Sequence, residues 1–434
     1  MLKRPRNVLK IIVPFAIAAN AFCSVAVSAP PSGAGYSLIY QEEFNGSALD
    51  SSQWYHRITL GKYTEGYMRA GNVSVEGGLL RLRYDYEDFN NDGVLDFTGG
   101  GILSRNLFGY GYYETRAKLF DAVSGLHTSF WSMGVRPNMP GATGDPDIQA
   151  DIDAKRIPLH NQFHEVDGFE HNSAAKLGMG TIKQAQQTTQ SRFAYRTEAE
   201  LGALMGEAIN FADWNTYGYE ISPDYHRFYI NGHLLFEIPS SQYPFQYGPM
   251  NFWLTSLPYT PNSNSSVLPG YSEFDYFKFY ARHDTAANRL GNAGFDARPL
   301  NNPDLQIVTG WIENYDDQAS MLVWDEYVDA TRSLKHEKAT SYLVTTKQNL
   351  QFIPNGNYRL TAYVKSSGGQ QQCAMRVLNY GGAERVYNIP ATASWTQITI
   401  DNVQVTNQSA TIAFTSNASG GQWLRVDKVA FQEM

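Results

Sequence analysis

The sequence predicts an all-β protein made of a β-jelly-roll sandwich followed by a second, smaller β-sandwich. Three observations predict this fold: short runs with alternating polar and apolar residues recur along the chain, helical periodicity is confined to one stretch, and the pattern restarts near residue 283. Many short runs of period two, bounded by turn residues, are typical of antiparallel sandwiches. With 434 residues, 43% of them hydrophobic, the chain is long enough for two cores.

The first 29 residues have the pattern of a secretory signal peptide. Four basic residues within the first ten precede an apolar run, and residues 27–29, Val-Ser-Ala, offer a small-residue cleavage site. The alternative is a membrane anchor, which the short run and its Pro14 and Asn20 disfavour. We therefore expect residues 1–29 to be removed and the protein to be secreted, extracellular or periplasmic, without a membrane partner after cleavage.

Composition excludes several classes of partner and site. The formal net charge is −8 and no basic patch or repeat stands out, so we expect no binding to nucleic acid. Signal cleavage would remove Cys23 and leave Cys373 alone, so we expect neither an internal disulfide nor a cysteine-based metal site. Aromatic residues make up 14% of the chain, which fits strand packing and stacking on sugars equally well. We expect a monomer.

The strand-like runs of the first sandwich lie within residues 37–283. An Asn231-Gly232 pair between two of them predicts a two-residue β-hairpin. The single predicted helix lies near 197–211 and is interpreted as a surface excursion. A Pro-, Asp- and Gly-rich stretch over 132–162 is too long for a hairpin, so we expect an ordered excursion over one face of the sheet. Such an excursion either walls a site or is a bland surface insertion.

The pattern of the second sandwich begins after a reset near residues 283–292. Strand-like runs such as YRLTAYVKS, TQITIDNVQV and ATIAFTS then follow to the end of the chain. We predict a separate β-sandwich over residues 290–434, a length within the usual range of a domain.

Residues 164–171, HEVDGFEH, place three carboxylates within six positions: Glu165, Asp167 and Glu170. In a regular strand, Glu165 and Asp167 point to one face and Glu170 points to the other. One extra residue, a β-bulge, would bring all three into line, and Gly168 is where such a bulge costs least. The spacing therefore predicts a bulged strand with three carboxylates on one face.

Two carboxylates that flank a glycosidic bond suffice to hydrolyse it. One protonates the leaving oxygen, and the other attacks the anomeric carbon or activates a water molecule. Glu165 and Glu170 are the candidates for this pair, although spacing alone does not say which glutamate attacks. Asp167 is predicted to hydrogen-bond the nucleophile and to separate the pKa values of the two glutamates. A solvated acidic strand or a calcium site are the alternatives for these residues.

The segments around this strand resemble glycoside hydrolase family 16, whose motif E-x-D-x-x-E reads EVDGFE here. Further segments follow in the order of the family: 38–54, 72–83, 99–119, 125–134, 213–239 and 273–282. The resemblance implies a concanavalin-like jelly roll and retaining endo-hydrolysis of a polysaccharide by double displacement. It also implies that Glu165 is the nucleophile, Asp167 its helper and Glu170 the acid/base. Trp131, in the Phe-Trp pair of the family, would line the sugar cleft.

The resemblance adds weaker candidates for substrate and metal binding. Arg105 and His127 are candidate substrate-binding residues, and a surface salt bridge is the alternative for Arg105. Catalysis in the family requires no cofactor. Many members bind a structural calcium ion, and the matching positions are the main chain near Glu43 and Gly78 and the carboxylate of Asp275.

The substrate stays open between a β-glucan such as laminarin and a galactan such as agar, porphyran or carrageenan. The second sandwich resembles carbohydrate-binding modules of families 4 and 22, through LGNAGFD at its start and RVDKVAF near its end. Its aromatic residues available for stacking are Trp311, Tyr315, Trp324, Tyr363, Tyr380 and Trp423. Two rival functions use the same scaffold: a non-catalytic glycan-binding lectin, and a transglycosylase that uses the same residues.

Overall fold

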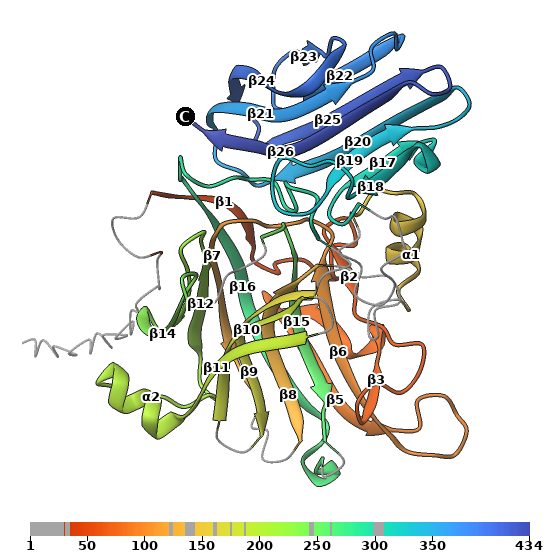
Figure 1. Cartoon of the computed structure of the whole chain (residues 1–434). Coiled ribbons are helices and arrows are strands. Elements are labelled where there is room, and N and C mark those ends of the chain that lie inside the picture. The colour runs from red at the N-terminus through yellow and green to blue at the C-terminus, as the bar shows by residue number, and fades with distance from the viewer. Residues whose placement is uncertain are drawn as a thin grey trace, which may run out of the picture.

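The structure is a computed structural model of the chain (Figure 1). It describes residues 30, 35–120, 125–134, 144–158, 163–173, 176–185, 188–242, 247–260, 263–297 and 308–434. The predicted signal peptide, residues 1–29, lies outside this part. None of the helices in these ranges has the length and apolar character needed to cross a membrane.

The first sixteen strands form one continuous antiparallel system, apart from a short parallel pairing of β3 with β6. Its order is β11-β10-β9-β8-β15-β6-β5-β16-β7-β12-β13-β14, with β1 on β16, β2 and β3 on β6, and β4 on β5. The strands are β1 (Tyr36–Glu42), β2 (Trp54–His56), β3 (Gly66–Met68), β4 (Val73–Glu76), β5 (Leu79–Glu87), β6 (Asp96–Ser104), β7 (Gly111–Lys118), β8 (Leu126–Met133), β9 (Phe163–Ser173), β10 (Lys176–Ala185), β11 (Thr188–Thr197), β12 (Asn215–Ile221), β13 (Tyr225–Ile230), β14 (His233–Pro239), β15 (Asn251–Pro258) and β16 (Gly270–Arg282).

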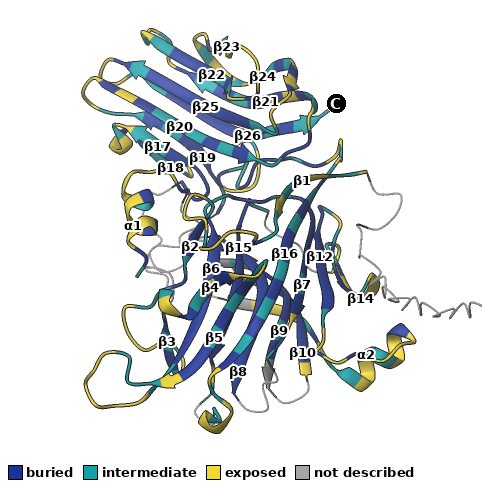
Figure 2. Cartoon of the chain, turned by 180° about the vertical axis from the view of Figure 1, so that it is seen from behind, coloured by how far each residue is buried: buried dark blue, intermediate teal, exposed yellow. Residues whose placement is uncertain are grey.

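This system folds back on itself, so that two layers enclose one aromatic-rich core. Phe130 of β8 lies 4.8 Å from Tyr219 of β12, and Phe252 of β15 stacks on Phe277 of β16 at 3.7 Å between ring centroids. All four rings are completely buried, and Figure 2 shows the buried residues running along the strands of both layers. The core therefore holds the layer that carries β9 flat against the layer that carries β12.

The predicted turn and the predicted helix are both confirmed, and the structure adds one helix that was not predicted. The Asn231-Gly232 hairpin is confirmed between β13 and β14, and both residues have positive φ, 48° and 81°, as a type I′ turn needs. The predicted helix is confirmed as α2 (Glu198–Met205), whose N-cap Thr197 forms a capping box with Glu200. A second helix, α1 (Pro146–Asp153), was not predicted, although Asp145 at its N-cap and proline at its first position mark its start. Short 3₁₀ turns are η1 (Ala70–Asn72), η2 (Ser265–Val267) and η3 (Asp317–Ala319).

The remaining ten strands form two five-stranded sheets that pack as a second sandwich around their own core. The sheet orders are β17-β20-β25-β22-β23 and β18-β19-β26-β21-β24. The strands are β17 (Ile312–Tyr315), β18 (Ser320–Val323), β19 (Ser333–Glu337), β20 (Tyr342–Gln351), β21 (Gly356–Ser366), β22 (Gln372–Leu378), β23 (Arg385–Asn388), β24 (Thr392–Val405), β25 (Ser409–Ala418) and β26 (Trp423–Glu433). The predicted all-β fold with two sandwiches is confirmed.

The two cores are separate, and Leu290 is the first residue of the second one in chain order. We therefore propose residues 37–283 and 290–434 as the two domains, as the sequence predicts. Side chains of the second sandwich also contact the first: Phe352, which follows β20, stacks on Phe108 of the first core at 4.8 Å, and the neighbouring Gln351 accepts a hydrogen bond from the main chain of Leu107 at 2.9 Å.

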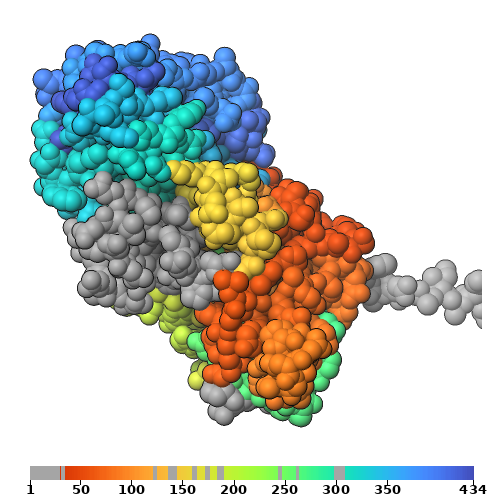
Figure 3. Space-filling model, turned by 90° about the vertical axis from the view of Figure 1, so that its right-hand side faces the viewer, coloured from red at the N-terminus to blue at the C-terminus, as the bar shows by residue number. Residues whose placement is uncertain are grey.

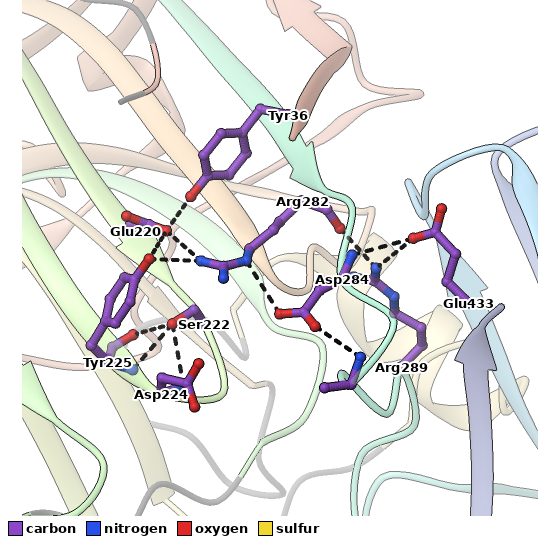
Figure 4. A network of polar contacts seen from close by, with 10 residues as sticks. Tyr36, Glu220, Ser222, Asp224, Tyr225, Arg282, Asp284, Arg289 and Glu433 are labelled. Carbon is purple, nitrogen blue, oxygen red and sulfur yellow. Dashed lines mark hydrogen bonds and ion pairs between the residues drawn. The ribbon is translucent and has the colours of Figure 1, made fainter. Parts of the chain in front are cut away.

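A polar network also joins the two sandwiches (Figure 4). Arg282, at the end of β16, lies 3.0 Å from the buried carboxylate of Glu220 on β12. Arg289 in the connecting segment donates to the main-chain carbonyl of Arg282 at 2.7 Å and lies 3.5 Å from Glu433 of β26. Because Arg289 and Glu220 are buried, these charge-assisted contacts help to fix the second sandwich against the first.

Candidate active site

Strand β9 carries the bulge that the sequence predicts at Gly168. Trp131 of β8 pairs with Asp167, whereas the residue before Trp131 pairs with Phe169, so β9 has one extra residue between these pairs. The register with β10 shifts at the same place. Gly168 has no room for a side chain, because a Cβ atom there would lie 2.3 Å from the ring of Tyr219. Glycine is therefore required both by the bulge and by the core beneath it.

The bulge brings the three carboxylates onto one face of the sheet. Val166 and Phe169 are completely buried in the core between the layers. Since side chains alternate and one residue is extra, Glu165, Asp167 and Glu170 point to the opposite face. We call this the carboxylate face: the face of β6, β8, β9, β10 and β15 that is turned away from the core.

The three acids differ in protonation. Burial, followed by the negative charges of Glu165 and Glu170, raises the pKa of Asp167 well above its usual range. A hydrogen bond with Glu165 acts in the same direction, because Asp167 donates its proton to that carboxylate. Burial, followed by the charge of Glu165, raises the pKa of Glu170 to about 7. The site thus keeps a proton on Asp167, holds Glu170 ready to donate one near neutral pH, and sets both beside the charge of Glu165.

His127 lies beside Glu170, with 3.6 Å between its Nε2 atom and the Oε1 atom of Glu170. Burial, followed by the positive charge of Arg57, lowers the pKa of His127 to about 3, so the imidazole is neutral. Its ring stacks on that of Tyr259 at 5.1 Å. His127, a predicted substrate-binding residue, is therefore placed at the acid pair as a neutral hydrogen-bonding group.

Trp131 also lies on the carboxylate face, since it is directly opposite Asp167. Its ring stacks on Trp253 of β15 at 4.6 Å, and its indole nitrogen donates to Thr255 Oγ1 at 3.2 Å. Only 7% of the residue is exposed, so Trp131 forms part of the floor of the site. Arg57 donates to the same hydroxyl of Thr255 at 2.9 Å. Sequence reasoning missed Arg57, because its partners come from strands far away in the chain.

Two exposed tyrosines border the acids. Tyr195 of β11 lies against Gly178 of β10, where a Cβ atom would come within 2.8 Å of the tyrosine ring. The charge of Glu170, after burial, raises the pKa of both Tyr195 and Tyr259, so both phenols lie near that carboxylate. Exposed rings with a polar tip, on either side of an acid pair, suit stacking on the apolar faces of sugar rings.

Arg105, a second predicted substrate-binding residue, is held by α1. Its Nη1 atom donates to Asp151 at 2.9 Å, and its other terminal nitrogen pairs with Asp147. Ile148 of the same helix packs in a cluster with Trp131 on the carboxylate face. The structure therefore shows the salt-bridge alternative for Arg105, which anchors α1 over one end of this face.

Helix α1 also reaches the second sandwich. Lys155, just after the helix, forms an ion pair with Asp317 of η3. A cavity of about 220 Å³ between the two parts is lined by residues of both, including Ile157 and Trp311. Figure 3 shows α1 at the surface between the second sandwich and the first strands of the chain. The described part of the predicted excursion thus walls the carboxylate face and touches both sandwiches.

The one side-chain ligand predicted for calcium, the carboxylate of Asp275, is paired with an arginine. The carboxylate of Asp275 lies 2.7 Å from Arg116, and the carboxylate of Glu43 lies 3.3 Å from Lys278. The main-chain ligands expected near Glu43 and Gly78 stay a prediction. Within the described ranges, no group of three or more His, Cys, Asp or Glu side chains is placed to bind a metal ion. Asp275, the carboxylate ligand that the resemblance implies, is thus already neutralised by an arginine.

Comparisons with known proteins point to the same chemistry. The chain is 25% identical to the keratan-sulfate endo-1,4-beta-galactosidase of Sphingobacterium multivorum over 406 residues, which cover 89% of this chain and 84% of that protein. It is 25% identical to the kappa-carrageenase of Pseudoalteromonas carrageenovora over 268 residues, 56% of this chain and 63% of the carrageenase. The solved catalytic domain of a laminarinase from Thermotoga petrophila is aligned over 58% of this chain and 100% of its own, with a TM-score of 0.44 and 17% identity. No family model matches the chain.

The class that the sequence relatives define is that of endo-acting glycoside hydrolases. The sequence resemblance to glycoside hydrolase family 16 is thereby confirmed. The likeness to the keratan-sulfate endo-1,4-beta-galactosidase covers 89% of this chain and therefore includes parts of both sandwiches.

Proposed function

We propose that this protein is a secreted, retaining endo-β-galactosidase that cleaves a galactose-containing polysaccharide at the carboxylates of β9. The arrangement of Glu165, Asp167 and Glu170 on one face of the bulged strand supports the reaction. The observation that supports a galactose-containing substrate is the likeness to the keratan-sulfate endo-galactosidase, which covers 89% of the chain. The signal-peptide pattern supports secretion.

The mechanism follows from the protonation of the three acids. Glu165 attacks the anomeric carbon, while Glu170 donates its proton to the leaving glycosidic oxygen. The resulting ester at Glu165 carries no charge, so the charge that raised the pKa of Glu170 is gone. Glu170 is then ionised and takes a proton from the water molecule that hydrolyses the ester. Asp167 holds Glu165 by the hydrogen bond that it donates.

The two rival functions are distinguished by different features. A lectin needs the aromatic residues of the face but not a glutamate whose pKa is raised to about 7, so the acids favour an enzyme. A transglycosylase would use the same three residues and differ only in whether water or a sugar hydroxyl reaches the ester. We propose hydrolysis as the main reaction.

We propose that the second sandwich binds glycan, as its resemblance to carbohydrate-binding modules implies. Of its candidate aromatic residues, Trp311 and Tyr380 are buried in or beside the core and are excluded as stacking platforms. Tyr315 and Trp324 are 71% and 67% exposed, so they are the strongest candidates. Isothermal titration calorimetry tests this role by comparing the affinity of the full-length parent and Trp324→Ala proteins for galactan oligosaccharides. Equal affinity of the two proteins would contradict the role of Trp324.

The test of the proposed function is a reducing-sugar assay on keratan sulfate, porphyran, κ-carrageenan, agarose and laminarin. We expect release of reducing ends from at least one galactan and little from laminarin. In the Glu165→Gln and Glu170→Gln proteins, this activity should fall by at least about 10²-fold. Cleavage of laminarin alone would overturn the galactan proposal, and binding without cleavage by the parent protein would favour the lectin.

A further inference from the structure

We propose that Phe193 and Tyr195 of β11 bind the leaving sugar of the substrate, a galactose unit, by stacking on its apolar face. The name β11 platform is used below for these two residues together with the two glycines of β10 beneath them, Gly178 and Gly180. The proposal rests on the proposed function and adds a binding site to the same cleft. All four residues lie outside the motif that carries the acids.

The β11 platform lies on the carboxylate face, level with two of the three acids. Gly178 of β10 is paired with Glu170 of β9 on one side and with Tyr195 of β11 on the other. The next row of paired residues repeats this arrangement, with the second glycine between Asp167 and Phe193. Paired residues point to the same face, so each ring shares a row with one acid, roughly 10 Å away between main chains.

The two glycines allow the rings to lie flat over β10. A Cβ atom at Gly178 would come within 2.8 Å of the Tyr195 ring, and one at Gly180 would come within 2.7 Å of the Phe193 ring. The rings therefore occupy the space that side chains of β10 would fill. Their planes differ by only 14°, with 5.6 Å between centroids, so together they form one nearly continuous aromatic surface.

This surface has one free side. Aromatic residues often cover glycines in sheets, which is a structural role and accounts for the position of the rings. Tyr195 is nevertheless 48% exposed and Phe193 is half-buried, as expected of rings that have one side on the sheet and the other side open. An open aromatic surface beside an acid pair suits stacking on a sugar.

The β11 platform ends at the row of the nucleophile. In that row, Ile182 of β10 is paired with Glu165 and with Ser191 of β11. An aliphatic side chain thus replaces the glycine, and a small polar one replaces the ring. The glycone becomes attached to Glu165, whereas Glu170 protonates the leaving oxygen. Because the rings share rows with Glu170 and its neighbour rather than with Glu165, we assign them to the leaving sugar.

The carboxylate face also has rings on the other side of the acids. Trp131 of β8 and Trp253 of β15 stack at 4.6 Å, and in the sheet order β10 and β11 follow β9 in the opposite direction. An endo-acting enzyme cuts inside a chain, so it has to hold sugars on both sides of the cleaved bond. Trp131 and the β11 platform are placed to hold one side each.

Galactose suits this platform because its 4-hydroxyl group is axial. The hydrogen atoms on C3, C4 and C5 then form an apolar patch on the opposite face of the sugar, which can stack on an aromatic ring. The phenol of Tyr195 lies near Glu170, whose charge, after burial, raises the pKa of this tyrosine. Its hydroxyl group is therefore placed to hydrogen-bond a polar group of the same sugar.

The first test measures binding. Phe193→Leu and Tyr195→Leu keep an apolar cover over the glycines but lose the flat ring, whereas Tyr195→Phe keeps it. The control is Tyr271→Leu, on β16 in the other layer, where the ring lies 4.3 Å from Arg81. Isothermal titration calorimetry uses neutral oligosaccharides from agarose and from desulfated keratan sulfate, with all proteins in the Glu165→Gln background to slow cleavage. We expect each Leu variant of β11 to weaken binding by about 10-fold, and Tyr195→Phe and the control by less than about 2-fold.

A kinetic readout tests the side of the cleaved bond. A galactooligosyl fluoride has a glycone but no leaving sugar, so its hydrolysis does not use the β11 platform. We expect Tyr195→Leu to lower kcat/KM on the oligosaccharide by about 10-fold and to leave kcat/KM on the fluoride unchanged. Gly178→Ala, in which the new Cβ atom displaces the Tyr195 ring, should act in the same way and replaces a Leu variant that does not fold.

The outcomes separate this proposal from the proposed function. Unchanged affinity in folded Leu variants, or an equal loss of kcat/KM on both substrates, overturns the role of the β11 platform. A parent protein that cleaves no galactan but binds these oligosaccharides less tightly after Tyr195→Leu would refute the proposed function and leave the platform standing. A parent protein that binds neither oligosaccharide would contradict both.

Discussion

Two sheet faces of the molecule carry clustered acidic residues. On one face the acids crowd one another, and on the other each acid is paired with a cation. On the carboxylate face of the first sandwich, Glu165, Asp167 and Glu170 face one another along one strand. Burial and their mutual repulsion raise the pKa of Asp167 and Glu170. Such crowding costs stability, because a negative charge there is both desolvated and repelled.

On the second sandwich, the acids of the segment that follows β18 are paired. Asp325 accepts two hydrogen bonds from Arg425, at 2.6 and 2.7 Å, and Glu326 accepts one from Lys365 at 2.6 Å. Arg425 lowers the pKa of Asp325 to about 2. These acids fasten a loop to the outer face of a sheet.

This difference helps to distinguish acids with a catalytic role from acids with a structural role. Asp325 and Glu326 each have a cation beside them, and in Asp325 this cation lowers the pKa. Acids that transfer protons, in contrast, lie next to one another without a cation of their own and keep a proton near neutral pH. This arrangement destabilises the folded protein, and interactions elsewhere in the fold have to compensate for it. On this basis we propose the β9 acids as the functional ones and Asp325 and Glu326 as structural.

The largest expected effect is on activity when either glutamate of β9 is replaced. Glu165→Gln and Glu170→Gln should each lower kcat/KM by at least 10²- to 10⁴-fold, since each loses a group that reacts with the substrate. Initial rates on the best galactan measure this. Asp325→Asn is the matched control and should keep parental activity. If Glu165→Gln or Glu170→Gln were as active as Asp325→Asn, the catalytic role proposed for that glutamate would be wrong.

A smaller effect is on stability as a function of pH. Because the pKa of Glu170 is raised from 4.5 to about 7, the folded protein binds more protons than the unfolded chain between these values. Its stability should therefore fall as pH rises through this window, and Glu170→Gln should remove that part of the fall. We expect the variant to be more stable than the parent at pH 8, by on the order of 1–3 kcal/mol.

Urea denaturation at pH 5 and pH 8 measures the difference between the two proteins. The same raised pKa predicts that kcat/KM of the parent declines above about pH 7, as Glu170 loses the proton that it donates. A parent protein that is at least as stable at pH 8 as Glu170→Gln would show that Glu170 is not strained.

Gly168→Ala tests whether the bulge aligns the acids. A Cβ atom at this position would lie 2.3 Å from Tyr219 and 2.9 Å from Phe130, so β9 has to shift. We expect a loss of about 1–3 kcal/mol in the free energy of unfolding and a larger relative loss of kcat/KM. Gly71→Ala is the control, because a Cβ atom there meets nothing within 4 Å. Full activity in a destabilised Gly168→Ala protein would show that alignment does not depend on the bulge.

The smallest effect is expected on the second sandwich. Asp325 is 61% exposed at its side chain, and exposed ion pairs contribute little. Asp325→Asn should therefore change the free energy of unfolding by less than about 1 kcal/mol, with no change in its pH dependence near neutrality. A pronounced change in chemical denaturation would mean that the loop acids matter more than their exposure suggests.

The sequence was informative where the signal is local. The spacing in HEVDGFEH predicts the bulge, because only an inserted residue reconciles Glu165 with Glu170, and Asn231-Gly232 predicts its own turn. The start of α1 also had a local signal in Asp145 and the proline after it, which the loop-like composition of the excursion obscured.

The rest could not be predicted because it depends on contacts between distant strands. Arg57 belongs to the site only because β2 and β15 bring it beside Trp131. The carboxylate partners of Arg105 could not be predicted, because α1, which supplies them, was not expected. The prediction that Asp275 binds calcium overlooked Arg116, which β7 places beside this carboxylate.

The central claim is that the bulged strand presents Glu165 as the nucleophile of a retaining reaction. The most direct measurement is mass spectrometry of the protein after reaction with a 2-deoxy-2-fluoro galactooligosaccharide that has an activated leaving group. We predict one covalent glycosyl group, on the peptide that contains residues 163–173, with fragmentation placing it on Glu165. A label on Glu170, or turnover with inversion and no label, would contradict the account.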